Sequence, residues 1–559
     1  MGIFAYFIFY FILLFSIVGF GYLFKVIFLK KEKINVGYCG LYGIFILTIL
    51  SYLANFFISI NFYFNSLILF IGLILFTFFL LKEFIKIKKN ILLFLLIFLV
   101  FFFFILTPKN HDDFPYYHFP YIHLLTISPI NIGTGIFNHG FRTHSSIFYF
   151  SSLFFLPIAQ YQLIHIAPVF FIGSVNFIFL KKIFYLTKIK TTQFSYILYL
   201  SILNLAFINI FFGRISEHGT DFSAQILILL IITEILILIH VNNKKVSNDQ
   251  FNRVYILIAL AASLKAFYLI YLSFLIIIFY YQKSKIEFIF NLFKNKIFYC
   301  CLSLLALVLI VNFINSGCIL YPISFSCNYN LIWTIKFEEV KLMSQWYELW
   351  SKAGATPNFR VPNPSDYIQN FNWIKNWINT YFFNHVLDFL LGLCFLILSI
   401  FFILNGNKKT NKKKIDHSKY FGIYLLIFLL FIEWFYKHPA LRYGGYHLIA
   451  LLVFIPFSFY LDKNILIDKK IILRINLFIL LIFIIFILRN IHRIYKQSIK
   501  YNYNLFIYSS FNKNFEDYHV YEQINKIKLC YSKNPDCEVD SIRVKKILDR
   551  YLFYREYKN

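Results

Sequence analysis

Charged residues are scarce in this sequence. Only 14% of its 559 residues are Asp, Glu, Lys or Arg, whereas 60% are hydrophobic, and the mean hydropathy is +0.67. An ordinary soluble domain is about one-quarter charged, and a folded core cannot hide this much apolar sequence from water. A soluble globular protein is therefore excluded, and the sequence predicts an all-α polytopic membrane protein.

Several other features are also missing. The eight cysteines form no cluster with metal-ligand spacing, and we find neither an internal repeat nor a heptad pattern. The first apolar run, Ile3–Phe24, lacks the basic start and the small-residue cleavage site of a signal peptide. A cysteine-based metal site is therefore not expected, and we expect Ile3–Phe24 to stay in the protein as a membrane span.

The net charge of +28 would suggest nucleic-acid binding in a soluble protein. Here the lysines lie in short loops between apolar runs, such as Lys30–Lys33, Lys86–Lys89 and Lys408–Lys414. That distribution is typical of topology signals in membrane proteins. We therefore expect membrane lipids as neighbours and no nucleic-acid partner.

Apolar runs of about the 20 residues that a membrane helix needs recur along the chain. They cover residues 3–24, 38–58, 64–81, 91–106, 163–180, 194–212, 222–239, 254–281, 297–314, 386–404, 421–436, 446–461 and 471–488. Lysine-rich loops belong on the cytoplasmic side, which places both termini on the other side.

The run 254–281 is the one difficulty for this threading. A single long span would move the following lysines, including Lys285 and Lys294, to the outer side and invert every later loop. A break near Lys265 gives two short spans and restores the pattern, and a lysine in the centre of a lipid-exposed helix is costly. We predict the break, and with it about 13–14 transmembrane helices.

This threading divides the chain into two parts. Residues 1–489 form the transmembrane domain, with large outer loops at 107–162 and 315–384. Residues 490–559 form a small C-terminal extracytoplasmic segment, which is too short for a large core of its own.

The first outer loop carries the sharpest local signal, the run His111-Asp112-Asp113 directly after a span. A carboxylate just above the bilayer can act as a general base or hold a divalent cation such as Mg²⁺ or Mn²⁺. The same pair also fits the acidic N-cap of an interfacial helix. Tyr117 and His118 add polar and aromatic side chains suited to a sugar or a headgroup, although aromatic belts at membrane interfaces look alike. The sequence does not choose between the two aspartates.

Three cations accompany these carboxylates on the predicted outer face. Arg142 and Arg442 lie in outer loops, and a guanidinium forms bidentate bonds to phosphate. Lys265, at the predicted break, faces the same side, and an ionisable residue at membrane depth is a candidate functional residue. The alternative for Arg142 is an arginine that reaches along the membrane surface to water.

A short outer segment adds two further acids, Glu217 and Asp221. They are four residues apart and share a face if a helix has already begun there. Either is a candidate ligand for the substrate. Acidic residues at the positive end of a helix dipole explain the pattern equally well.

Two cysteine pairs lie in polar segments on the outer side, Cys318 with Cys327 and Cys530 with Cys537. Disulfides form in oxidising compartments. Each pair is therefore a candidate disulfide, with free thiols as the alternative.

Residues 110–121 (NHDDFPYYHFPY) and 138–143 (NHGFRT) resemble a family of bacterial membrane proteins that is similar to the GT-C glycosyltransferases. Residues 317–322 (GCILYP) and 439–443 (PALRY) extend the resemblance over most of the chain. In the GT-C class, an aspartate of the first outer loop is the catalytic base or a metal-associated carboxylate, and Asp112 and Asp113 match that place. They follow the fourth predicted span here, rather than the first.

This resemblance implies an enzyme that moves a sugar from a polyprenyl-phosphate donor to a cell-envelope glycan, lipid or protein. The reaction would take place at the outer leaflet of the bacterial cytoplasmic membrane. Asp113 or Asp112 would deprotonate the acceptor hydroxyl, and Arg142, Lys265 and Arg442 would stabilise the phosphate leaving group. No cofactor is required if these cations carry the charge, and a divalent cation is the alternative.

Two other functions fit the same pattern less closely. An O-antigen-type polymerase or ligase is also polytopic with arginines in large outer loops, but it needs no outer-loop carboxylate base. A non-enzymatic lipid or glycan transporter often has internal repeats and charges near the bilayer midplane, which this sequence lacks. Sensitivity to the arginines with indifference to the aspartates would favour the first of these.

Overall fold

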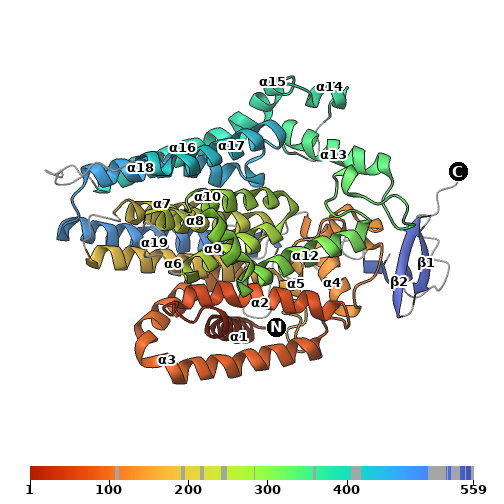
Figure 1. Ribbon diagram of the computed structural model, residues 1–559, viewed down its shortest axis with the longest axis horizontal. Helices are drawn as coiled ribbons and strands as arrows, with labels where there is room; N and C mark the ends of the chain where they lie inside the picture. Colours follow the sequence, from red (N-terminus) through yellow and green to blue (C-terminus); the bar gives the residue numbers. More distant parts are fainter. Residues whose placement is uncertain are drawn as a thin grey trace.

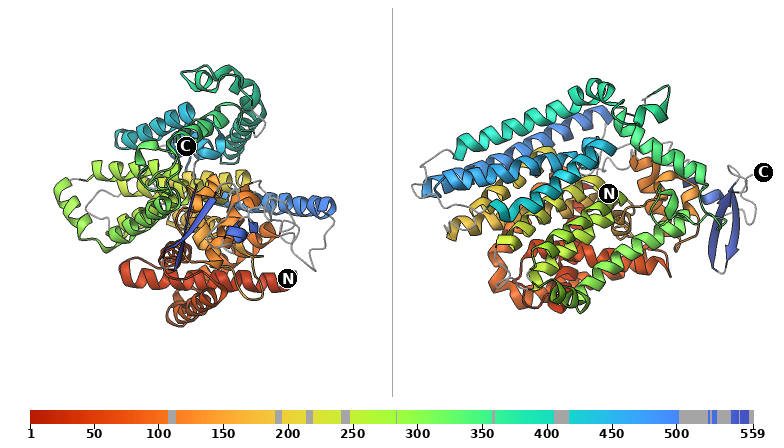
Figure 2. Two further views of the ribbon diagram at one scale, coloured as in Figure 1. Left: turned by 90° about the vertical axis from the view of Figure 1, so that its right-hand side faces the viewer. Right: turned by 45° about the horizontal axis from the view of Figure 1, so that its top comes forward.

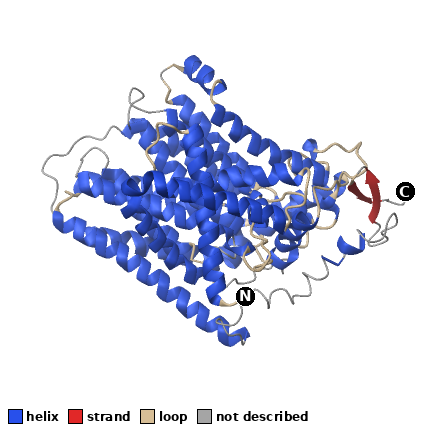
Figure 3. Cartoon of the chain, turned by 90° about the horizontal axis from the view of Figure 1, so that it is seen from below, coloured by secondary structure: helices blue, strands red, loops and turns tan. Residues whose placement is uncertain are grey.

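The computed structural model describes residues 1–106, 113–189, 195–213, 219–240, 248–282, 284–356, 360–404, 417–501, 524–525, 527–530, 542–547 and 549–555. Almost all of the described chain is helical, as Figure 3 shows by colour. The elements are α1 (Ile3–Phe28), α2 (Val36–Asn55), α3 (Phe62–Ile105), η1 (Phe114–His118), α4 (Phe119–Ile127), η2 (Thr134–Ile136), η3 (His139–Phe141), α5 (Ser146–Ser152), η4 (Ile164–Ile166), α6 (Ala167–Ile189), α7 (Ser195–Phe211), α8 (Gly219–His240), α9 (Asn248–Leu264), η5 (Ala266–Ser273), α10 (Phe274–Tyr280), α11 (Lys285–Phe293), α12 (Lys296–Ser316), η6 (Ser324–Ser326), α13 (Phe337–Lys352), α14 (Pro364–Ile368), α15 (Ile374–Trp377), η7 (Ile378–Val386), α16 (Leu387–Leu404), η8 (His417–Tyr420), α17 (Phe421–Lys437), η9 (Leu441–Tyr443), α18 (Gly445–Asn464), α19 (Lys469–Tyr501), β1 (Ile542–Ile547) and β2 (Arg550–Arg555).

The architecture is an all-α bundle with the composition of a multi-pass membrane protein, as the sequence predicts (Figure 1). Among the described residues, nine helices are long and apolar enough to cross a membrane. Two further apolar helices, Ser195–Phe211 and Ala266–Tyr280, are shorter. Backbone groups in lipid must be satisfied within the segment, which is why the spans are helices.

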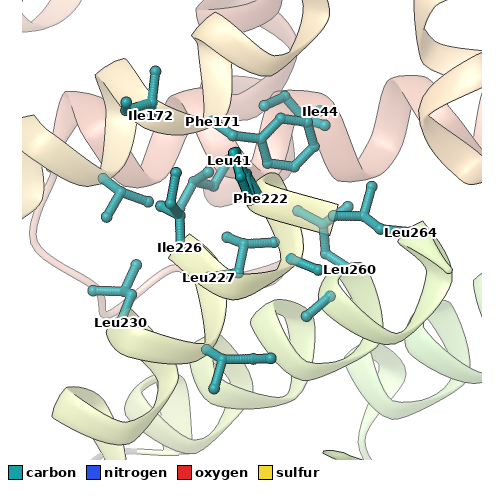
Figure 4. Packing of buried hydrophobic residues seen from close by; sticks show 14 of the residues in the cluster. Leu41, Ile44, Phe171, Ile172, Phe222, Ile226, Leu227, Leu230, Leu260 and Leu264 are labelled. Carbon is teal, nitrogen blue, oxygen red and sulfur yellow. The ribbon is translucent and has the colours of Figure 1, made fainter. Parts of the chain in front are cut away.

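The centre of the bundle is formed by α2, α6, α8 and α9. Figure 4 shows Leu41 of α2, Phe171 of α6, Ile226 of α8 and Leu260 of α9 packed together. All four side chains are fully buried. Helices that are apolar on every side, such as α8, belong in such a position.

Helix α1 packs very closely against its neighbours. A Cβ atom on Gly19 would lie 2.1 Å from the carbonyl oxygen of Gly72 in α3, and one on Gly21 would lie 1.6 Å from that of Cys39 in α2. Small residues let membrane helices approach to backbone contact. These glycines therefore fix the three N-terminal helices against one another.

The two ends of α3 lie closer together than a straight helix of its length allows. Asn65 donates a hydrogen bond to the carbonyl oxygen of Phe155 (2.9 Å), and the carbonyl oxygen of Ile105 lies 3.3 Å from Nε2 of His165. A straight helix would separate residues 65 and 105 by roughly 60 Å. The ten residues from Phe155 to His165 can span at most about 36 Å. The helix therefore turns back within its length, which agrees with two predicted spans joined through the lysines of 82–90.

The predicted break in the run 254–281 is confirmed. Helix α9 ends before Lys265, whose backbone is extended (φ −163°, ψ 142°), and the 3-10 helix η5 followed by α10 leads back. At the start of this return limb, the ammonium of Lys265 lies 2.5 Å from Asp221. At its other end, Tyr281 lies beside Gly422, where an added Cβ would be 3.1 Å from the tyrosine hydroxyl. These contacts mark two opposite ends of the bundle. We call the end that holds Lys265 and Asp221 the Lys265 end.

The short return limb reaches as far as α9 because part of it is a 3-10 helix. Seventeen residues of α9 rise roughly 26 Å at 1.5 Å per residue. The eight residues of η5 at 2.0 Å and the seven of α10 at 1.5 Å rise about the same distance together. The tighter helix thus compensates for the small number of residues.

Three of the predicted cytoplasmic loops meet at the opposite end, which we call the lysine-loop end. Arg253 pairs with Glu32 (2.6 Å) and with Glu234 (2.9 Å), and Lys182 pairs with Glu234 (2.5 Å). Tyr38 also donates to Glu234 (2.5 Å). Loops far apart in sequence therefore lie together at the end to which their lysines assigned them.

The predicted C-terminal segment is partly described. Helix α19 continues to Tyr501, and β1 and β2 form an antiparallel hairpin that projects beside the helices (Figure 2). The hairpin docks on the first outer loop, because Ile132 donates to the carbonyl oxygen of Tyr551 (3.0 Å) and accepts from Phe553 (2.9 Å). Arg550 adds a hydrogen bond to the carbonyl oxygen of Ile130 (2.5 Å).

Candidate functional site

Asp221 is the centre of an ion network at the Lys265 end. It lies in the first turn of α8, where the positive end of the helix dipole favours an acid, and its side chain is 1% exposed. Its Oδ1 lies 2.5 Å from Nζ of Lys265, and its Oδ2 lies 3.2 Å from Nε of Arg442. One buried carboxylate thus holds two cations side by side.

Asp113 completes the network from the first outer loop. Its Oδ2 lies 3.0 Å from Nη2 of Arg442, and its side chain is 28% exposed. We call Asp113, Asp221, Lys265 and Arg442 the ion network. Four separate parts of the chain supply it: the start of η1, α8, the break after α9, and η9.

Two aromatic rings flank the cations of the ion network. The guanidinium carbon of Arg442 lies 5.5 Å from the ring centres of both Trp350 and Tyr443, and Nζ of Lys265 lies 4.9 Å from that of Tyr443. The two rings meet edge to face, with centres 5.6 Å apart. Both residues are partly exposed, so the cations have an aromatic wall next to solvent.

The surroundings fix the protonation of two neighbouring groups. Burial raises the pKa of Tyr117, and the charge of Asp113 raises it further, so the phenol keeps its proton and can donate it in a hydrogen bond. Burial alone would lower the pKa of Arg442, but Asp221, Tyr443 and Asp113 raise it well above its usual range. Arg442 therefore remains a cation.

The backbone that carries Arg442 is held in place from α8. Nε2 of Gln225, one turn after Asp221, donates to the carbonyl oxygen of Arg442 (2.8 Å). The hydroxyl of Tyr268 donates in turn to the carbonyl oxygen of Asp221 (3.2 Å). Helix α8 thus positions both the side chain and the main chain of the arginine.

Comparison with known proteins assigns the chain to one family. The model of a family described as a domain of unknown function, DUF8201, matches residues 3–450. The chain belongs to this family. All four residues of the ion network lie within the matched region. No curated protein and no solved structure matches the chain.

Arg142, predicted to bind phosphate, pairs with Glu339 of the second outer loop. Its Nε donates to the carbonyl oxygen of Gly135 (2.9 Å), its Nη1 to the hydroxyl of Tyr321 (2.7 Å), and its Nη2 to Glu339 (2.5 Å). The residue is 3% exposed. Arg142 therefore ties the first outer loop to the second, and its expected contact with phosphate stays a prediction.

Of the other residues predicted to act in catalysis or substrate binding, His118 is buried and three lie outside the described residues. His118 is buried, and its ring centre lies 4.9 Å from that of Phe148 and 4.4 Å from that of the partly exposed Tyr117. His111, Asp112 and Glu217 lie outside the described residues. Among the described residues, no three His, Cys, Asp or Glu side chains form a group that could hold a metal ion.

Sequence reasoning missed Trp350 and Gln225. Trp350 comes from α13, more than two hundred residues after Asp113, and nothing in its local sequence links it to Arg442. Gln225 could have been predicted from the sequence, because it follows Asp221 by four residues and therefore lies on the same face of α8.

One predicted disulfide is present and the other is half described. Cys318 and Cys327 are bonded. Cys530 is buried and disulfide-bonded, and Cys537, its predicted partner, lies outside the described residues. Cys318 and Cys327 lie in the second outer loop.

Proposed function

We propose that this protein is a GT-C-type glycosyltransferase that uses a polyprenyl-phosphate sugar. The acceptor is a cell-envelope glycan, lipid or protein at the outer leaflet of the bacterial cytoplasmic membrane. The observation that carries the proposal is the ion network, in which a partly exposed carboxylate, Asp113, touches a cation that a buried carboxylate holds in place.

Asp113 takes the role of the general base. It removes the proton of the acceptor hydroxyl, whose oxygen then attacks the anomeric carbon of the sugar. The bond from that carbon to the phosphate oxygen breaks, and the lipid phosphate leaves with the electron pair. Asp113 is the more exposed carboxylate of the ion network, as a base that meets its substrate must be.

Arg442 and Lys265 stabilise the charge that develops on the leaving phosphate. A guanidinium and an ammonium fixed beforehand near this oxygen need no rearrangement during the reaction. Asp221 keeps them together, since two cations without a carboxylate between them would repel each other. Their side chains are 20% and 25% exposed, so a ligand can reach them.

The aromatic wall formed by Trp350 and Tyr443 suits a sugar next to the phosphate. An aromatic face packs against the apolar C–H face of a sugar ring, while Tyr117 supplies a hydrogen-bond donor nearby. The lipid tail of the donor would remain in the bilayer between the helices. Trp350 and Tyr117 come from different outer loops, so both loops would contact the sugar.

Two independent signals support the proposed orientation in the membrane. The lysine loops gather at one end, and cytoplasmic loops carry excess lysine and arginine. The described disulfide cysteines belong to the other part of the chain, and disulfides persist outside the cytoplasm. Both signals support a position of the ion network on the outer side. A Mg²⁺ or Mn²⁺ ion at Asp112 and Asp113 is the alternative to charge stabilisation by Arg442 and Lys265.

The proposal is tested by replacing Asp113 with Asn and measuring transfer of labelled sugar from a panel of polyprenyl-phosphate sugars in membranes that contain the protein. We expect transfer to be abolished at normal expression, because an amide cannot accept the proton. Asp366→Asn is the matched control, since Asp366 is an exposed acid of the second outer loop. Full activity in both Asp112→Asn and Asp113→Asn would remove the carboxylates from the mechanism.

A further inference from the structure

Helix α11 connects α10 to α12 at the lysine-loop end and has an unusual surface. Ser284 caps its start by accepting a hydrogen bond from the backbone of Glu287 (3.4 Å). Four of its six apolar side chains, Ile286, Ile289, Phe290 and Phe293, are 72%, 41%, 63% and 58% exposed. Their spacing of i, i+3, i+4 and i+7 places them on one face of the helix.

The opposite face of α11 holds the helix against the bundle. Phe288 is half-buried, and its ring centre lies 6.3 Å from that of Phe251 in α9 and 6.1 Å from that of Phe279 in α10. Successive residues of a helix are about 100° apart around its axis, so Phe288 and Phe290 are separated by roughly 160°. The exposed apolar face therefore points away from the protein.

This apolar face continues the surface of the two neighbouring helices. Ile276 and Tyr280 of α10 are 66% and 64% exposed, and Tyr299 and Leu302 of α12 are 51% and 50% exposed. Helix α12 is one of the helices long and apolar enough to cross a membrane. The surface around α11 is thus continuous with a surface that faces lipid.

Basic side chains surround this apolar face. Lys285 begins α11, Lys294 follows it, and Lys296 begins α12, whereas Glu287 is the one acid between residues 284 and 296. Asn295 donates a hydrogen bond to Asn252, the neighbour in sequence of Arg253, which pairs with Glu234 at the lysine-loop end. The segment therefore lies at that end. Lysines beside an apolar face are complementary to anionic lipid headgroups.

We propose that α11 lies in the plane of the membrane, with its apolar face among the acyl chains and its lysines on anionic phospholipid headgroups. A second copy of the chain is a poor occupant of this face. Helix α11 alone, with nine residues, is roughly 14 Å long and 10 Å wide and offers about 140 Å². A standard interface buries about 800 Å² on each partner, so α11 by itself is too small for one. The inference concerns the lysine-loop end and does not depend on the proposed enzymatic activity.

The depth of α11 is tested with nitroxide labels on the full chain in nanodiscs of phosphatidylglycerol and phosphatidylcholine. The free cysteines Cys39, Cys300, Cys301 and Cys394 are first replaced by alanine. Phe290→Cys then carries a label on the apolar face, and Asn291→Cys, on the polar side, is the matched control. We expect the label at 290 to collide with oxygen and to be shielded from a water-soluble nickel chelate, with the reverse at 291.

Equal exposure of both labels to the nickel chelate would overturn the proposal, because α11 would then lie in water. Spin–spin broadening of the label at position 290 would also overturn it, because that would show a second copy on this face. Both substituted side chains are exposed, so neither label displaces a core residue.

The lipid preference is tested by native mass spectrometry with phosphatidylglycerol. Lys285→Gln combined with Lys294→Gln is expected to weaken binding about 30-fold, since each lysine near an anionic surface contributes about 1 kcal/mol. Lys341→Gln combined with Lys375→Gln, two exposed lysines of the second outer loop, is the control. Unchanged phosphatidylglycerol binding in the first variant would remove the anionic headgroup from the proposal.

Discussion

Asp221→Asn and Asp113→Asn should affect the protein in different ways, although both remove one carboxylate from Arg442. Asp221 is 1% exposed and contacts both Lys265 and Arg442. Its replacement leaves two neighbouring cations without their shared carboxylate. Breaking a buried ion pair by removing one partner typically costs about 3–5 kcal/mol, and we expect a loss of stability of this size.

Asp113 is 28% exposed and pairs with Arg442. Partly exposed ion pairs contribute about 0–1 kcal/mol, so Asp113→Asn should leave the stability almost unchanged. The two variants therefore differ by about 3 kcal/mol. At roughly 2 °C for each kcal/mol in a large domain, their melting temperatures should differ by about 6 °C.

The assay is thermal unfolding of the purified protein in detergent, followed by tryptophan fluorescence. Asp113→Asn should melt with the wild-type protein and lose sugar transfer, whereas Asp221→Asn should melt early. Asp366→Asn serves as the control for loss of an exposed acid. Equal melting temperatures for Asp113→Asn and Asp221→Asn would refute the reasoning, because Asp221 would then not hold the two cations together.

Three further outcomes are expected. Burial lowers the pKa of His438 to about 4, below its ordinary value of about 6.5, so stability should fall as the pH drops from about 6.5 to about 4, and His438→Gln should reduce that fall in melting temperature. Glu339→Gln should cost about 1–3 kcal/mol by leaving the buried Arg142 without its carboxylate, and protease should then cut the second outer loop faster. Thiol alkylation of denatured, unreduced protein should leave Cys318 and Cys327 unlabelled, and labelling of both would place that loop in a reducing compartment.

The break at Lys265 shows how far a charge pattern can predict structure. The sequence required the break because the later lysine loops would otherwise lie on the wrong side. The structure has it, with an extended backbone at Lys265 between α9 and η5. What the pattern did not predict is that the return limb begins with a 3-10 helix, because that depends on the distance to be spanned and not on local composition.

The two predicted arginines show the limit of such reasoning. Both were candidates because guanidinium binds phosphate, yet Arg442 joins Asp113 and Asp221, whereas Arg142 is bound to Glu339 and to Tyr321. Their local sequences are equally consistent with either role. Only the partners that the fold brings to each arginine distinguish them.

The sequence by itself determined the class of protein, the two groups of loops and the carboxylates worth examining, because hydropathy and lysine position act along the chain. Tertiary structure alone decided that Asp113 and Asp221 share Arg442 and that Trp350 lies beside it. Asp113, Asp221, Trp350 and Arg442 are far apart in the sequence, and no local preference encodes such a contact. The contact arises because the packed helices bring their ends together, where the carboxylates and the cations attract one another.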